Sequence, residues 1–145
     1  MTGIVVGVDG SSGSHQALEW AMKEARIRRA PLTVLTVHQV AAGHWTGNPL
    51  IYPEDRPAQE QAEHAAEEAV KKVSTELGAA APDAVTVRAV SGLAAKELIA
   101  ASEAADLLVV GSRGAGGFSN LLLGSVGTQV VNHAQCPVTV VRSRQ

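Results

Sequence analysis

The order of apolar runs along the chain limits the possible fold more than any other feature of the sequence. Five short runs rich in Val, Leu and Ile alternate with segments in which small or apolar residues recur at helical spacing. We expect strands at residues 4–8, 32–37, 85–90, 106–110 and 138–141, and helices from the serines at 11–14 to Arg29 and at about 58–77, 94–102 and 125–134. Unbroken apolar strands in such an alternation are typical of a parallel sheet covered by helices on both faces.

The composition agrees with one α/β domain over residues 1–145. Hydrophobic residues make up 46% of the chain, but aromatic residues only 3%, so the core has to be built from aliphatic side chains. A net charge of −2 gives no sign of a nucleic-acid or anionic membrane partner. A basic leader and a long apolar run are absent, and Cys136 is the single cysteine. We therefore expect a cytoplasmic protein with no membrane span and no intrachain disulfide.

The helix expected over residues 58–77 is amphipathic. Its apolar face is predicted to consist of Ala62, Ala65, Ala69, Val73 and Leu77. Residues 39–57 before it are rich in glycine and proline. This stretch is longer than most connections in compact domains, so it is either functional or mobile.

Glycine-containing loops follow the first and the fourth expected strands, at residues 7–11 and 111–117. In an open parallel sheet, ligands bind beyond the carboxyl ends of the strands, where the strand order reverses. Glycine lets the backbone approach a phosphate closely, and Gly124 and Ser125 place a helix start, with its free N–H groups, after the second loop. These loops predict a phosphate-binding site, although each glycine run could instead serve only as a turn.

Standard nucleotide motifs are absent. The chain contains no G-x-x-x-x-G-K-[ST] sequence, and no G-x-G-x-x-G follows the first strand. Arg113 is the only cation in the glycine loops, which disfavours vigorous phosphoryl transfer. The histidines have no metal-ligand spacing, and no base is placed in the sequence to activate Ser125. We therefore assign no catalytic residue and no metal-ligating residue. Asp9, at the end of the first strand, either contacts a ligand or caps the first helix.

The stretch from Gly111 to Ser125 resembles the Gly-2x-Gly-9x-Gly-(Ser/Thr) signature of ATP-binding universal stress proteins. Its glycines are Gly111, Gly114 and Gly124. The opening Ile-Val-Val-Gly-Val-Asp-Gly-Ser and the ending Cys-Pro-Val-Thr-Val-Val are also similar to this family, so the resemblance covers the whole chain. It implies a single universal-stress-protein-like domain with a Rossmann-like, adenine nucleotide α-hydrolase-like sheet of strand order 3-2-1-4-5.

The resemblance also implies a site for ATP with Mg²⁺. Asp9 would lie beside the ribose and adenine, with Gly7 and Val8 in the floor and Val37 against the adenine. The residues expected around the ribose and phosphates are Gly111, Arg113, Gly114, Gly116, Gly117, Gly124, Ser125 and Val126. Some relatives carry a basic residue where this chain has Leu121, and that departure is expected to weaken phosphate binding.

The family usually forms homodimers by antiparallel pairing of the last strands, here Val138 to Val141. The function that the resemblance implies is an ATP-binding stress-response or signalling regulator. It would act on an unknown protein partner through a nucleotide-dependent conformation, with at most slow ATP hydrolysis. Two alternatives stay open: a dimeric interaction protein that binds no nucleotide, and a genuine ATPase or adenylate-using enzyme. A flavodoxin-like electron carrier is less well supported, because no cofactor-stacking aromatic residue is evident beside the strand ends.

Overall fold

The computed structural model describes residues 3–39, 56–112 and 123–142. The elements in these ranges are β1 (Ile4–Val8), α1 (Ser12–Arg28), β2 (Leu32–Gln39), α2 (Arg56–Leu77), the 3₁₀ helix η1 (Gly78–Ala80), β3 (Val85–Gly92), α3 (Ala94–Ser102), β4 (Leu107–Gly111), α4 (Ser125–His133) and β5 (Val138–Val141). The bounds agree with the expected strands and helices to within two residues.

The five strands form one parallel sheet in the order β3-β2-β1-β4-β5, which confirms the predicted fold class. β1 lies at the centre, where Ile4 is in register with Leu32 of β2 and with Leu107 of β4. The chain proceeds outward from β1 in one direction through β2 and β3, and in the other through β4 and β5. The strand order therefore reverses between β1 and β4, which is where sheets of this kind bind ligands.

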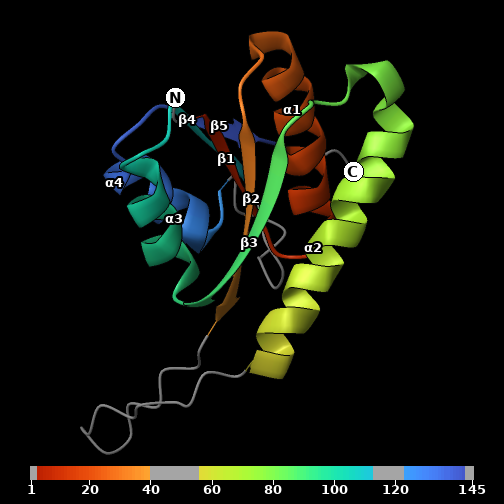
Figure 1. Cartoon of the computed structure of the whole chain (residues 1–145). Coiled ribbons are helices and arrows are strands. Elements are labelled where there is room, and N and C mark those ends of the chain that lie inside the picture. Colours follow the sequence, from red (N-terminus) through yellow and green to blue (C-terminus); the bar gives the residue numbers. More distant parts are fainter. Residues whose placement is uncertain (1–2, 40–55, 113–122, 143–145) are drawn as a thin grey trace, which may run out of the picture.

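Helices cover both faces of the sheet, with α1 and α2 on one side and α3 and α4 on the other (Figure 1). Side chains alternate between the two faces along each strand. Ile4 and Val6 of β1 enter the core beneath α1 and α2, whereas Val5 packs into the core beneath α3 and α4. β4 is buried from Leu107 to Val110, because both of its faces are covered.

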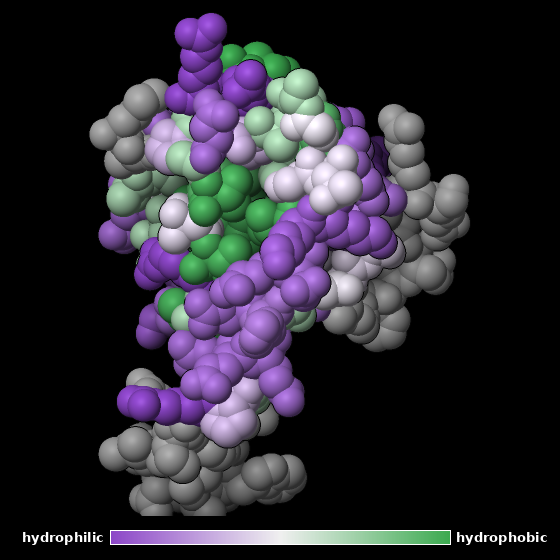
Figure 2. Space-filling view, turned by 45° about the vertical axis from the view of Figure 1, so that its right-hand side comes forward, coloured by the Kyte–Doolittle hydropathy of each residue, from purple (hydrophilic) through white to green (hydrophobic). Residues whose placement is uncertain are grey.

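The inward face of α2 differs by one position from the prediction. Ala65 is exposed, whereas Ala66 and Val73 are buried against the sheet. The alanines on either side of this position are chemically alike, so the sequence pattern does not set the rotation of the helix to within one residue. The outer surface of α2 is hydrophilic, as the space-filling view shows (Figure 2). Pro57 lies in the first turn of α2, where a missing N–H costs no helical hydrogen bond.

Candidate functional site

The loop after β1 is held by a short network of hydrogen bonds around Asp9. The backbone N–H and the hydroxyl of Ser11 both donate to Asp9 Oδ1, the former over 2.9 Å. Asp9 N in turn donates to Ser14 Oγ over 3.2 Å. Gly10, between them, adopts a φ of +82°, which is accessible mainly to glycine. The strand end, the turn and the start of α1 therefore form one unit.

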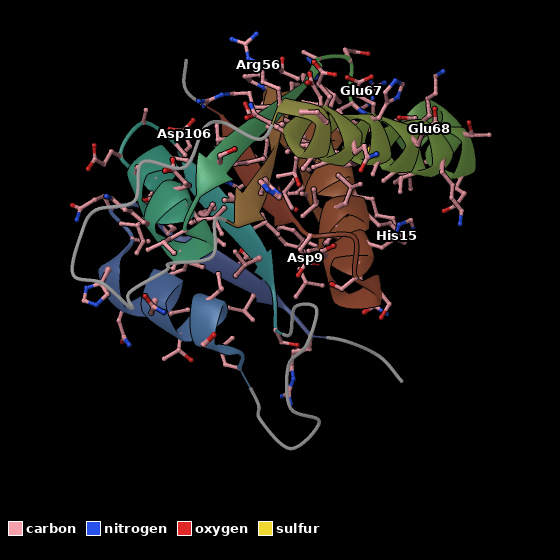
Figure 3. The ribbon with its side chains drawn as sticks, turned by 90° about the horizontal axis from the view of Figure 1, so that it is seen from below. Asp9, His15, Arg56, Glu67, Glu68 and Asp106 are labelled. Carbon is pink, nitrogen blue, oxygen red and sulfur yellow. The ribbon has the colours of Figure 1, made fainter. Side chains whose placement is uncertain are left out.

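Ser11, and not Asp9, is the N-cap of α1. The Ser11 hydroxyl accepts a hydrogen bond from Ser14 N, as a capping side chain does. The Asp9 side chain is exposed at the end of β1, near the middle of the sheet's carboxyl edge (Figure 3). Of the two roles considered for Asp9, helix capping is wrong, while ligand contact stays a prediction. Of the serines at 11–14 that could cap this helix, Ser14 instead lies inside α1 and accepts the hydrogen bond from Asp9 N.

Gly7 and Val8 point to opposite faces of the sheet. A Cβ atom at Gly7 would lie 2.9 Å from Leu98 Cδ2, so the absence of a side chain here lets α3 pack closely on β1. Val8 is half-buried and packs into the core beneath α1 and α2. The structure thus gives both residues a packing role, and their predicted part in a ligand floor stays a prediction.

Val37 lies near the end of β2, in register with Val90 of β3. Its half-buried side chain packs into the core beneath α3 and α4. It is therefore on the same face of the sheet as the start of α4, and on the opposite face from Val8. Its predicted contact with adenine stays a prediction.

The end of β4 is joined directly to the start of α4. Gly124 N donates to the buried Ser112 O over 2.7 Å, and Ser112 N donates to Val141 O of β5 over 2.9 Å. Gly127 is buried, and a Cβ atom on it would lie 2.7 Å from Leu123 Cδ1 and 3.8 Å from Gly111 O. The first turn of α4 therefore packs closely against the carboxyl end of β4.

The start of α4 has the features of an anion-binding helix terminus. Its N-cap is Gly124, an extended residue that provides no capping side chain, and the first turn contains no acidic residue. Ser125 is exposed and Val126 is half-buried. A helix start without a capping side chain directs free N–H groups and the positive end of the helix dipole outward. This turn can therefore receive a phosphate or a carboxylate.

The structure brings part of the predicted site together at one edge of the sheet. Gly7 and Val8 end β1 and Asp9 follows them. Gly111 ends the neighbouring β4, and next to it Gly124 caps α4, which begins with Ser125 and Val126. Four of the predicted site residues, Arg113, Gly114, Gly116 and Gly117, lie outside the described residues, as does Leu121. In the described part of the chain, His, Cys, Asp and Glu side chains form no group of three that could hold a metal ion.

A groove of about 370 Å³ lies elsewhere, between α3 and the sheet. It is lined by Gly3 and Pro31 near the amino ends of the strands, by β2 and β3 side chains, and by small residues of α3 and the turn after it. Because ligands of such sheets bind beyond the opposite ends of the strands, we place the candidate site at Asp9 and the start of α4 and not in this groove.

Cys136, which precedes β5, is half-buried against the core beneath α3 and α4. Burial raises the pKa of its thiol; the Leu108 backbone hydrogen bond lowers this pKa, and the Asp106 carboxylate, the smallest of the three effects, raises it. The side chain is therefore a neutral thiol near pH 7, as expected of a small packing residue. None of the described helices is long and apolar enough to cross a membrane.

Comparison with known proteins identifies relatives along almost the whole chain. Residues 1–142 match the model of the universal stress protein family. A universal stress protein of Mycolicibacterium smegmatis is 37% identical over 139 residues, which cover 96% of this chain and 47% of the relative. The chain thus spans about half the length of the curated relatives it matches.

Solved structures agree with this match. The universal stress protein UspA from Lactobacillus plantarum superimposes with a TM-score of 0.78 at 26% identity, covering 97% of both chains. A universal stress protein in complex with cAMP superimposes with a TM-score of 0.66, also at 26% identity, covering 97% of this chain and 96% of the other.

Proposed function

Because the chain belongs to the universal stress protein family, we propose that it binds ATP with Mg²⁺ at the carboxyl ends of β1 and β4. In this proposal the phosphates lie at the start of α4, and the adenosine lies toward Asp9 and Val37. The nucleotide favours one conformation of the domain, and that conformation is read by a protein partner in a stress response in the cytoplasm. The whole chain, residues 1–145, acts as one domain of this type.

The start of α4 carries most weight for this proposal. Gly124 caps the helix without a side chain, and its N–H donates to Ser112 O, which holds the first turn at the end of β4. The N–H groups of this turn, which no side chain caps among the described residues, lie beside the carboxyl end of β4, one of the two strands between which the strand order reverses. A phosphate placed there gains charge-assisted hydrogen bonds and the favourable field of the helix dipole.

The adenosine end of the proposed site rests on Asp9 and on a related structure. The Asp9 carboxylate is exposed and is held in place by Ser11, so it is oriented before any ligand arrives. A carboxylate at this position can accept hydrogen bonds from ribose hydroxyl groups, as acidic residues do in other nucleotide-binding sheets. The related structure in complex with cAMP supports an adenine nucleotide as the class of ligand.

The described residues fit Mg²⁺ only as an ion that arrives with the nucleotide. No group of three carboxylates, histidines or cysteines exists among them, and Asp9 Oδ1 already accepts hydrogen bonds from Ser11. Mg²⁺ keeps several water ligands and is usually bound through one or two carboxylates together with substrate phosphates. Bound in this way, the ion would offset the charge of the phosphates. We assign no catalytic base, so hydrolysis would be slow at most.

We also propose a homodimer formed by β5. Leu108 N donates to the carbonyl of Pro137, just before β5, and Ser112 N donates to that of Val141 in β5, so both carbonyls face β4. Hydrogen-bonding groups alternate in direction along a strand, which leaves those of Val138 and Val140 facing away from the sheet. A second copy of β5 could therefore pair antiparallel with the first. In that pairing, Val138 of each copy would lie opposite Val140 of the other.

Calorimetric titration of nucleotide-free protein tests the nucleotide proposal. ATP and ADP with MgCl₂ should bind more tightly than AMP, because the helix start contributes only when phosphates reach it. Adenosine should bind weakest. A protein that is folded by circular dichroism but gives no heat with any of these ligands at millimolar concentration contradicts the proposal.

The observations at Gly7 and Gly127 favour one alternative, a dimeric interaction protein that binds no nucleotide. Both glycines allow close packing, against Leu98 and Leu123 respectively, so neither requires a ligand to explain it. This alternative predicts no heat in the titration together with a stable dimer. The enzymatic alternative predicts turnover at or above about one per second, the range of ordinary enzymes.

A further inference from the structure

Among the described residues, β3 is an edge strand with one neighbour, and half of its backbone groups face away from the sheet. It pairs with β2 in a register that places Leu32 opposite Val85. Leu32 N donates to Ala84 O over 3.0 Å. Since hydrogen-bonding groups alternate in direction along a parallel pair, the groups that face β2 belong to Thr86, Arg88 and Val90. Those that face outward belong to Val85, Val87, Ala89 and Ser91.

Gln59 of α2 occupies one of these outward positions. Its Nε2 donates to Ala89 O over 2.8 Å, and its Oε1 accepts a hydrogen bond from Ser91 Oγ over 3.0 Å. The hydroxyl of Ser91 orients the amide, so that its NH₂ group is directed at the Ala89 carbonyl. One side chain thus uses the backbone acceptor that an incoming strand would need.

The two edges of the sheet differ in this respect. β3 has eight residues, carries the exposed Arg88 and has the Ala89 carbonyl taken by Gln59. β5 has four residues, Val138 to Val141, with no charged side chain among them. Charged residues and covered backbone groups are the devices by which edge strands avoid pairing with other chains. β3 has both of these devices.

We propose that Gln59 is an edge plug, which prevents a second chain from pairing with β3 and so confines self-association to β5. The Gln59 side chain lies across the strand only because α2 packs beside β3, so the plug depends on the position of the first turns of this helix. The proposal does not require nucleotide binding, so a failure of the proposed ligand to bind would not contradict it.

The variant Gln59→Ala tests this plug, with Gln61→Ala as the matched control. Gln61 lies on the same helix but is exposed. We expect light scattering to give Gln59→Ala a molar mass that rises with concentration well above that of the wild type, while Gln61→Ala remains like the wild type. The rise in molar mass should persist in the double variant Gln59→Ala, Val140→Pro. The second substitution removes an outward N–H of β5 and so disfavours pairing through that strand. A folded Gln59→Ala protein with the wild-type mass at every concentration overturns the proposal.

Hydrogen exchange separates an edge plug from a simple anchor of α2. In the assembled Gln59→Ala protein, the outward amides of Val85, Val87 and Ala89 should exchange more slowly than in the wild type, because a second chain covers them. Faster exchange at the start of α2, with no new protection in β3, would show that Gln59 only anchors the helix. If the wild type is monomeric, the β5 dimer is wrong, but the comparison of Gln59→Ala with Gln61→Ala still decides the role of Gln59.

Discussion

Gly7 of β1 and Leu98 of α3 lie so close that a Cβ atom on Gly7 would be 2.9 Å from Leu98 Cδ2. This contact joins the central strand to the helix that covers it, next to the turn that holds Asp9. It explains why glycine occupies this strand position without reference to a ligand. The same packing sets the position of the strand end at which we place the candidate site.

Replacing Gly7 with alanine should lower the free energy of unfolding by about 1–2 kcal/mol, because the Leu98 methyl group must move to make room. Urea denaturation monitored by circular dichroism measures this loss. In a Leu98→Val background the same substitution should cost clearly less, since the contacting methyl group is then farther away. An equal loss in both backgrounds would contradict the packing explanation.

Replacing Ser11 with alanine should remove the N-cap of α1 and cost about 1 kcal/mol of stability. The exposed Ser12, which begins α1, provides the matched control, and Ser12→Ala should have a much smaller effect. Urea denaturation compares the two variants with the wild type. If both serines contribute equally, the capping role assigned to Ser11 is wrong.

Cys136 should react with iodoacetamide more slowly at pH 8 than a cysteine in an unfolded peptide. Burial raises the pKa of its thiol, so less of the reactive thiolate is present at this pH. The rate should keep rising with pH after that of the peptide has levelled off. The free energy of unfolding should also fall as the pH rises above the ordinary pKa of a thiol, because Cys136 loses its proton more readily in the unfolded chain than in the folded one. Identical pH profiles for protein and peptide would refute the assigned burial effect.

The β5 dimer makes a specific prediction about cross-linking. If Val138 pairs with Val140 of the second copy, Thr139 lies opposite its own counterpart as a non-hydrogen-bonded pair, with Cα atoms about 4.5 Å apart. That spacing suits a disulfide. In a Cys136→Ala background, Thr139→Cys should therefore form dimers on mild oxidation, visible on a non-reducing gel, and Val138→Cys should form far fewer. Equal cross-linking of both variants would mean that the pairing register is different.

The fold could be predicted because strands that are buried on both faces consist of consecutive apolar residues, which can be recognised in the sequence. Leu107 to Val110 are all apolar since every one of them is buried, whereas the edge strand β3 alternates half-buried residues with the exposed Thr86 and Arg88. The inward face of α2 was misplaced by one residue, because Ala65 and Ala66 are the same amino acid and only packing against the sheet distinguishes them.

The site could be predicted only in part, because several of its contacts join residues that are far apart in the sequence. The glycines at the ends of β1 and β4 were recognised, but the packing of Gly7 on Leu98 depends on how α3 crosses the sheet. Similarly, nothing in the sequence near Gln59 indicates that its amide reaches the backbone of Ala89. Contacts of this kind follow from the assembled fold and not from local patterns.

The most direct test of the central claim is a calorimetric titration with ATP and MgCl₂ of the wild type, Ser125→Glu and Ser125→Gln. A carboxylate in the first turn of α4 is favourable for the helix, so Ser125→Glu should remain folded, yet it should repel the phosphates. We predict saturable binding by the wild type, at least a tenfold loss in Ser125→Glu and a much smaller loss in Ser125→Gln. The same affinity in all three proteins, or no binding by the folded wild type, would contradict phosphate binding at the start of α4.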